Sequence, residues 1–159
     1  MVQPWRGPLP NPSFRGQVSM HGEVPLTAVV SGEITLGRDV SPLGSPRMGG
    51  RVADAYLSVN ASGKDDTNAL DLELDVKIND TSCLTTKPKI RHVSGEDSTQ
   101  KSTKVSGEAG CTSAVIDTDN DSYSPGDFFT YTLTLTRTAS PTTEMSNAAI
   151  VVELEPDVI

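Results

Sequence analysis

The sequence predicts an all-β protein built as a two-sheet antiparallel β-sandwich, and three observations lead to that fold class. From Leu70 to Ile78, aliphatic residues alternate strictly with charged ones, so a strand there would have one apolar and one polar face. From Phe129 to Leu135, apolar residues alternate with threonines in the same way. Only 4% of the residues are aromatic, and 13 glycines and 11 prolines supply many turns, which suits short strands better than a helical bundle.

Residues 69–78 form the central predicted strand. A helix would spread their leucines around its whole circumference and leave no continuous apolar stripe, so the period of two outweighs the helix propensity of leucine, glutamate and lysine. A strand with one polar face belongs to a sheet that is solvated on one side, and its apolar face needs a second layer. We expect residues 128–137 to supply all or part of that layer.

Other stretches predict shorter or less regular strands. Residues 24–36 indicate two strands, or one strand broken by a bulge at Gly32. Residues 52–60 alternate, and the residues expected on the inward face are Ala53, Ala55, Leu57 and Val59. Further strands are expected at 82–86, 111–116 and 147–155. Together these patterns give about eight strands and no convincing helix, which we interpret as a jelly roll.

Residues 1–22 are expected to form an extended N-terminal arm in front of a β-sandwich domain at residues 23–159. Four prolines and the lack of any periodicity favour an extended segment. A disordered tail is the simpler interpretation, but it does not explain the large apolar residues along the arm, so we expect it to dock on another surface. The partner-binding residues that we propose on the arm are Trp5, Arg6, Leu9, Phe14 and Arg15.

Two long loops are expected within the domain. Residues 37–50 are rich in glycine and proline, and residues 94–110 contain a polar stretch that we expect to be mobile. The first loop carries Arg38 and Arg47 with Asp39 as its single acid. We therefore add Arg38 and Arg47 to the partner-binding residues.

The charge of the chain argues against a nucleic-acid partner. The formal net charge is −8, and the arm has two arginines and no acid, so the remaining 137 residues carry 21 acids against 11 bases, a net of −10. No stretch approaches the roughly 20 apolar residues of a membrane span, and the N-terminus lacks the apolar run of a secretory signal. We expect a protein made in the cytoplasm, without a membrane or nucleic-acid partner.

The sequence offers no candidate for catalysis. His21 and His92 stand in unrelated contexts, and no G-x-S-x-G or H-E-x-x-H pattern occurs, so we expect no enzyme and no cofactor. The acids of the central strand are spaced to line a solvated face. Cys83 and Cys111 lack the spacing of zinc ligands, and they are expected to be buried free thiols or, in an oxidising setting, a disulfide.

One acidic turn has the spacing of a cation site. Asp117, Asp119 and Asp121 occupy alternate positions, as carboxylates do in calcium-binding loops. The match to an EF-hand is partial, because Ser122 stands where that loop needs glycine and Phe128 where it needs a bidentate glutamate. The simpler interpretation is an acidic turn, and we expect no metal, with these three residues as the calcium candidates.

The second half of the chain resembles a family of virion proteins. The run from Tyr123 to Leu133, Y-S-P-G-D-F-F-T-Y-T-L, leads to a last apolar strand and resembles the final strands of small jelly-roll proteins on tailed-phage virions. Residues 54–59, followed by 63–68 and the strand at Leu70, look like the earlier hairpin of the same proteins. These are similar to capsid decoration or cement proteins and head fibres, and the resemblance covers about residues 50–155.

The resemblance implies a non-enzymatic homotrimer that sits on the major capsid protein and strengthens the shell. On this basis we expect a virion structural protein on the outer surface of a phage capsid, made in the host cytoplasm, with the arm and the low-acid loop facing the shell. The alternative is a carbohydrate- or receptor-binding β-sandwich module, a head fibre or adhesin. Only Tyr56 and Tyr123 are obvious candidates for stacking on a sugar ring, and a glycan array would separate the two functions.

Overall fold

The computed structural model describes residues 25–66, 69–137 and 140–157, and these residues form an all-β sandwich with no helix. The arm at residues 1–22 lies outside the described residues, so the prediction of an extended, docking arm is not tested. None of the described residues forms a helix of the length and hydropathy that a membrane crossing requires.

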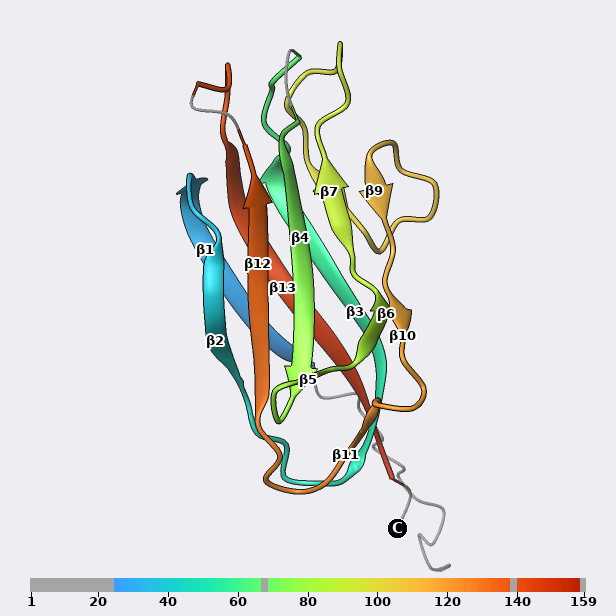
Figure 1. The fold of residues 1–159 in the computed structure, drawn as a ribbon. Helices are drawn as coiled ribbons and strands as arrows, with labels where there is room; N and C mark the ends of the chain where they lie inside the picture. Colours follow the sequence, from blue (N-terminus) through green and yellow to red (C-terminus); the bar gives the residue numbers. More distant parts are fainter. Residues whose placement is uncertain (1–24, 67–68, 138–139, 158–159) are drawn as a thin grey trace, which may run out of the picture.

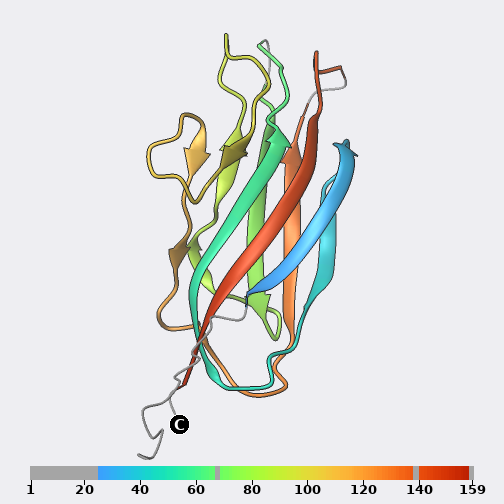
Figure 2. The same cartoon turned by 180° about the vertical axis from the view of Figure 1, so that it is seen from behind.

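Two antiparallel sheets face each other across the core (Figure 1). The β13 sheet, seen in front in Figure 2, has the order β1-β13-β3-β11, with β8 paired to β3. Its strands are β1 (Leu26–Ile34), β3 (Gly50–Ala61), β8 (Lys101–Ser102), β11 (Ser122–Tyr123) and β13 (Met145–Pro156). The β4 sheet has the order β2-β12-β4-β7-β9, with β5 paired to β4. Its strands are β2 (Arg38–Gly44), β4 (Asp71–Ile78), β5 (Thr81–Ser82), β7 (Lys89–Arg91), β9 (Cys111–Thr112) and β12 (Phe129–Thr136). A separate short pair joins β6 (Leu84–Thr86) to β10 (Val115–Ile116).

The prediction for the central strand is confirmed. Leu72, Leu74 and Val76 on β4 are completely buried, and they meet the inward residues of the β13 sheet, among them Leu57 and Ile150, which are equally buried. Each such side chain contributes on the order of 2 kcal/mol to the free energy of folding when it leaves water. The core is therefore aliphatic and lies between the two sheets.

The prediction that residues 128–137 supply the facing layer is wrong. Strand β12 pairs with β4 in the same sheet over its whole length, from Phe129 opposite Ile78 to Thr136 opposite Asp71. The facing layer consists of β1, β13 and β3. Period-two alternation tells which face of a strand is apolar, but a neighbouring strand and a facing strand show the same alternation.

The prediction of a long irregular loop at residues 37–50 is also wrong, because residues 38–44 form β2 and Gly50 begins β3. Pro42 is compatible with this strand because β2 lies at the edge of the β4 sheet, where a missing N–H on the outer side breaks no ladder. The register of β2 against β12 also shifts twice. A proline and an irregular register both hinder pairing with another chain.

Bulges explain the outcome at two other strands. The predicted break at Gly32 is confirmed as a bulge inside the single strand β1, where Gly32 has a φ of 82° and its N–H donates to the Asn147 side chain at 2.8 Å. The inward position predicted for Ala53 is wrong, because β3 is bulged there. Val52 is buried instead, and Ala53 is exposed.

The strand count differs from the expected eight because residues 81–123 form seven strands of only two or three residues. Within the long loop at residues 94–110, β8 pairs with β3, and the Thr103 amide donates to the Leu57 carbonyl at 2.9 Å. Part of the loop expected to be mobile is therefore held against the sheet. The long strands β1 to β4 alternate between the two sheets, as a jelly roll requires, and the jelly-roll assignment itself stays a prediction.

The hairpin between β4 and β5 turns at Asn79 and Asp80, whose φ values are 47° and 69°. Two residues with positive φ make the tight hairpin turn in which glycine is favoured at the second position. We expect Asp80→Gly to raise the free energy of unfolding by about 0.5 kcal/mol. Asn79→Gly should lower it, because the Asn79 side chain accepts a hydrogen bond from the Phe128 amide at 3.0 Å. Urea unfolding of the two variants checks both signs, and a gain from both would show that only backbone conformation matters.

Candidate functional site

The proposed partner-binding residues on the arm, Trp5, Arg6, Leu9, Phe14 and Arg15, lie outside the described residues. The other two are described and exposed, but the structure does not bring them together. Arg38 begins β2 opposite Leu133, whereas Arg47 lies in the turn that follows β2. Six residues of strand place them roughly 20 Å apart, so the expected low-acid loop is not one continuous surface.

Arg47 lies at the end of the sandwich where the described chain begins. The first residues of β1, the turn at residues 45–49, the loop between β11 and β12, and the last residues of β13 meet there (Figure 2). Two backbone hydrogen bonds hold the turn in place, from Gly126 to the Pro46 carbonyl at 3.1 Å and from Asp157 to the Gly49 carbonyl at 2.9 Å. We call this the arm end, because residues 1–24 join the sandwich here.

The arm end contains a pocket of about 410 Å³ with a mainly apolar lining. This volume lies within the range of pockets that bind small molecules. Its lining residues are Leu26, Ser45, Pro46, Arg47, Met48, Tyr123, Leu154 and Pro156. They come from four separate segments, so only the folded chain assembles the pocket.

The inner wall of the pocket is firmly packed. Tyr123 is buried and meets the Phe129 ring edge-on, with 5.5 Å between the ring centroids. Burial raises the pKa of Tyr123, and the carboxylate of Asp157 raises it further. A side chain at Gly50 would collide with the Tyr123 hydroxyl and the Glu155 carbonyl, so glycine is required there. At the mouth, Met48 is 43% exposed, which is unusual for so large an apolar side chain.

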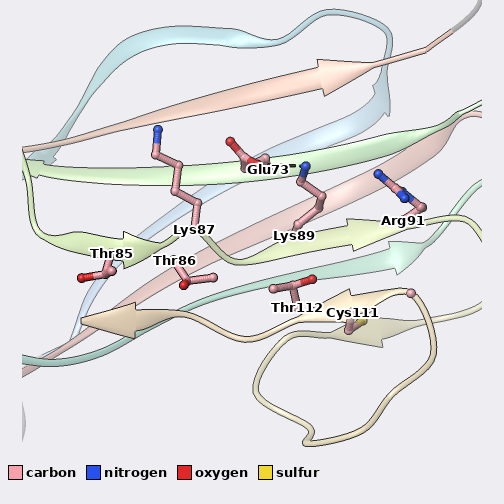
Figure 3. A pocket seen from close by; sticks show the side chains of 9 residues that line it. Glu73, Thr85, Thr86, Lys87, Lys89, Arg91, Cys111 and Thr112 are labelled. Atoms are coloured by element: carbon pink, nitrogen blue, oxygen red, sulfur yellow. Dashed lines mark ion pairs between the residues drawn. The ribbon is translucent and has the colours of Figure 1, made fainter. Parts of the chain in front are cut away.

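A larger groove, of about 590 Å³, lies on the outer face of the β4 sheet (Figure 3). Its cations are paired with the acids of β4: Lys89 with Glu73 at 3.0 Å, and Arg91 with Asp71 at 3.2 Å. Lys87 continues the series with an ion pair to Asp75 at 3.1 Å. Each named charge in the groove therefore has an opposite charge beside it. The acids are largely covered, with exposed side-chain fractions of 6% for Asp71 and 12% for Asp75. The expectation that the acids of β4 line a solvated face is therefore wrong for Asp71, which is buried.

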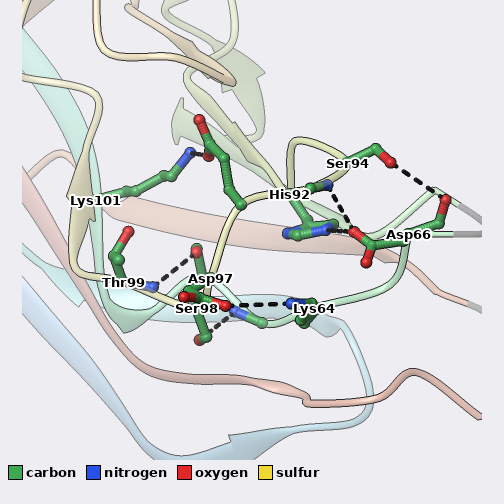
Figure 4. Close-up of polar contacts among 12 residues, drawn as sticks. Lys64, Asp66, His92, Ser94, Asp97, Ser98, Thr99 and Lys101 are labelled. Atoms are coloured by element: carbon green, nitrogen blue, oxygen red, sulfur yellow. Dashed lines mark hydrogen bonds and ion pairs between the residues drawn. The ribbon is translucent and has the colours of Figure 1, made fainter.

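The opposite end of the sandwich holds a polar cluster that ties two loops together (Figure 4). The Ser62 amide donates to the Thr99 carbonyl at 2.8 Å, and the Thr99 amide donates to the Ser62 hydroxyl at 3.2 Å. Lys101 is buried, and its ammonium donates to Glu96 at 2.7 Å and to the Ala109 carbonyl at 2.6 Å. These contacts hold the loops in place beside a pocket of about 320 Å³, which is lined by Glu96, Asp97, Thr99, Lys101, Glu108 and Ala109.

Asp66 belongs to the same cluster. Its carboxylate accepts a hydrogen bond from the Gly95 amide at 2.9 Å and lies 2.9 Å from the Nε2 atom of His92. The Gly95 amide, and next the His92 ring, lower the pKa of Asp66. A carboxyl group with a lowered pKa in the folded state stabilises that state above the ordinary pKa of 3.8, and this contribution disappears as the pH falls through the lowered value.

We therefore expect Asp66→Asn to speed hydrogen exchange of the Gly95 amide several-fold at pH 7. The difference from the unchanged chain should shrink as the pH falls from 3.8 through the lowered pKa of Asp66, because below that value the carboxyl group is protonated in the closed loop as well as in the open one. Exchange measured by NMR at neutral and acidic pH checks this. Equal exchange at pH 7 would show that the Asp66 contacts do not hold the loop.

The calcium candidates do not converge on one point. Asp117 accepts hydrogen bonds from the Asp119 amide and from the Asn120 side chain, at 3.1 and 2.8 Å. Asp121 is buried and pairs with Arg51 at 3.7 Å, while Asp119 is exposed. Among the described residues, no group of three or more histidines, cysteines, aspartates or glutamates is placed to hold a metal ion.

Both cysteines are free thiols, and the expected burial is confirmed for Cys83 but wrong for Cys111, which is half-buried. Burial raises the pKa of Cys83 to about 12 and that of Cys111 to about 11, so both thiols are protonated near neutral pH. A disulfide between them is not formed, and neither thiol has the low pKa of a reactive cysteine.

The two tyrosines considered for sugar stacking are both in contact with other side chains. Tyr123 is packed inside the arm end, as described above. The Lys104 ammonium lies over the Tyr56 ring, 5.0 Å from its centroid, and is held there by Asp54 at 2.8 Å and by Glu153 at 3.0 Å. Tyr123 therefore offers no free face for sugar stacking, and one face of the Tyr56 ring is occupied by Lys104.

Comparison with protein-family models, with curated proteins and with solved structures finds no match for this chain. The functional argument therefore depends on the fold and surface alone. The sequence names Arg47 as a candidate, a prediction that stays untested, and it does not reveal the pocket beside this residue. The one signal was Met48, a large apolar residue inside a turn of glycines and prolines.

Proposed function

We propose that the chain is a structural protein of a phage virion, which decorates and stabilises the outer surface of the capsid by binding the major capsid protein. The observation that supports this most is the arm end. Three features lie together at one end of the sandwich: the point where residues 1–24 join it, which we call the root of the arm, the exposed Arg47, and the apolar pocket with Met48 at its mouth. A partner held by the arm would meet this end first.

The remaining surface suits an outward orientation. The domain after the arm has a net charge of −10, and the outer face of the β4 sheet is covered by paired charges. Such a surface stays solvated and discourages further association. The acids Asp127 and Asp157 also lie near the arm end, so apolar contact, and not a low acid content, is what distinguishes this end.

The proposal includes a homotrimer, because three arms on one assembly would combine weak individual contacts into tight attachment. It places the protein on the outside of the virion, with the major capsid protein and its own copies as partners. It includes no enzymatic activity, cofactor, nucleic acid or membrane. The sheet alternation of β1 to β4 supports the jelly-roll assignment that the proposal uses.

Co-sedimentation with capsids that lack the protein tests this function. The full chain should pellet with the capsids, and Arg47→Glu should weaken its binding several-fold, because Arg47 lies at the arm end. Arg38→Glu is the matched control, since it makes the same charge change at the far end of β2, and it should bind like the unchanged chain. If the protein does not pellet but binds glycans on an array, the carbohydrate-binding alternative replaces this proposal.

A further inference from the structure

We propose that the pocket at the arm end is the seat of the Phe14 side chain of the same chain, which fastens the root of the arm to the sandwich. This contact would exist in the free protein, so it does not depend on capsid binding. It divides the arm into a root that is anchored by Phe14 and a distal part that carries Trp5 and Leu9.

The pocket has the chemistry to receive an aromatic ring. Leu154 and Tyr123 form a buried wall, and Leu26, Pro46 and Pro156 complete an apolar lining around about 410 Å³ of space. Phenylalanine is among the side chains that gain most from leaving water, and Tyr123 in the pocket wall offers it an aromatic contact. Insertion would also cover Met48, which is otherwise 43% exposed.

The distance along the chain between the pocket and the arm favours Phe14 as the side chain that fills the pocket. Leu26 lines the pocket and is the second described residue, and Phe14 is the nearest aromatic residue before it, twelve residues away. Twelve residues span up to roughly 40 Å when extended, and Gly16 and Gly22 lie between them, where the chain has to reverse. Trp5 is farther away and is separated from the pocket by a stiffer, proline-rich segment.

The negative charge of Asp157 at the rim of the pocket also favours Phe14 as the occupant. The backbone of Asp157 is bonded to Gly49, beside the pocket, and its carboxylate is near enough to raise the pKa of Tyr123. Arg15 follows Phe14 directly, so seating Phe14 brings a cation toward Asp157. The other nearby cation, Arg47, already lies on the pocket rim and is exposed.

The same chain is favoured over a second copy because the arm is tethered at the pocket. A short flexible tether gives an effective concentration in the millimolar range, which exceeds that of separate molecules in dilute solution. The arm of a second molecule would fill the pocket only at protein concentrations that approach this millimolar effective concentration.

Disulfide trapping in the full chain tests the inference. Under mild oxidation, Phe14→Cys with Met48→Cys should form an intramolecular bond at least ten-fold faster than two control pairs, Leu9→Cys with Met48→Cys and Phe14→Cys with Val115→Cys. Val115 is a suitable control because it is 51% exposed, much like Met48, but lies on β10. The native thiols should not interfere, since burial raises their pKa to about 12 and about 11. Peptide mapping under non-reducing conditions identifies the bond.

A double-mutant cycle measured by thermal unfolding gives an independent reading. Phe14→Ala should lower Tm by about 5 °C in the unchanged chain and by much less when Met48→Asp is already present. Leu9→Ala should leave Tm unchanged in both backgrounds. Equal trapping rates for all three pairs, or additive shifts in Tm, would overturn the inference. A covalent dimer as the main product would show that the pocket takes the arm of a second copy instead.

Discussion

Replacing Leu72 by aspartate should unfold the domain or leave it aggregated. Leu72 is completely buried near the start of β4, paired with Leu135 of β12 on one side and with Ile90 of β7 on the other, under the β13 sheet. The substitution removes an aliphatic group from a close-packed core and puts a carboxylate there without a partner. The expected loss in the free energy of unfolding is about 5 kcal/mol, which is comparable with the whole stability of a domain of this size.

Glu73→Gln is the matched control at the next position. The Glu73 side chain is 28% exposed on the outer face and pairs with Lys89, and such half-exposed pairs contribute little. This variant should change the free energy of unfolding by less than about 1 kcal/mol. Circular dichroism and urea unfolding compare the two variants. Similar losses from both would mean that β4 is buried on both faces, which contradicts the two-layer arrangement.

Deleting residues 1–22 should abolish attachment to capsids while leaving the sandwich folded. Every described residue of the core lies after this segment, and on that basis we expect the sandwich to fold without the arm. Trp5 and Leu9, on the distal part of the arm, are large apolar groups on a segment stiffened by prolines, and each could contribute on the order of 2 kcal/mol when fully buried against the capsid. Three arms in a trimer would multiply this contribution.

A chain that begins at Glu23 should therefore show the circular dichroism of the full chain, a Tm lower by about 5 °C because the Phe14 contact is lost, and at least a hundred-fold loss of capsid binding in co-sedimentation. Within the full chain, Trp5→Ala should weaken binding more than Arg6→Ala, because apolar burial and not charge carries the attachment. If the shortened chain binds capsids as well as the full chain, the arm does not contribute to attachment, and the attachment surface lies on the sandwich.

The strands with strict alternation could be predicted because period two requires no knowledge of neighbours. Strand β4, strand β12 and the bulge at Gly32 all follow from local patterns. The assignment of β12 to a layer could not follow, since pairing partners are set by long-range packing. The loop prediction around Pro42 failed for a similar reason. Proline is excluded from central strands but tolerated in an edge strand, and whether a strand lies at the edge depends on how the whole sheet is ordered.

The arm end could be predicted only in part. Arg47 and the apolar residues of the arm are visible in the sequence, but the pocket joins Leu26, Met48, Tyr123 and Leu154, which are spread over most of the chain. None of them belongs to a motif. The burial of Tyr123 depends on its contact with Phe129 and on the glycine at position 50, which no local pattern reveals.

Cryo-electron microscopy of the decorated particles tests the central claim most directly. The account predicts that the sandwich stands on the shell with its arm end inward, so that the turn at residues 45–49 and the end of β13 face the major capsid protein. Density for the arm should lie between sandwich and capsid. A sandwich bound through the charged outer face of the β4 sheet, or with the loops around Ser62 and Thr99 toward the shell, would contradict the account.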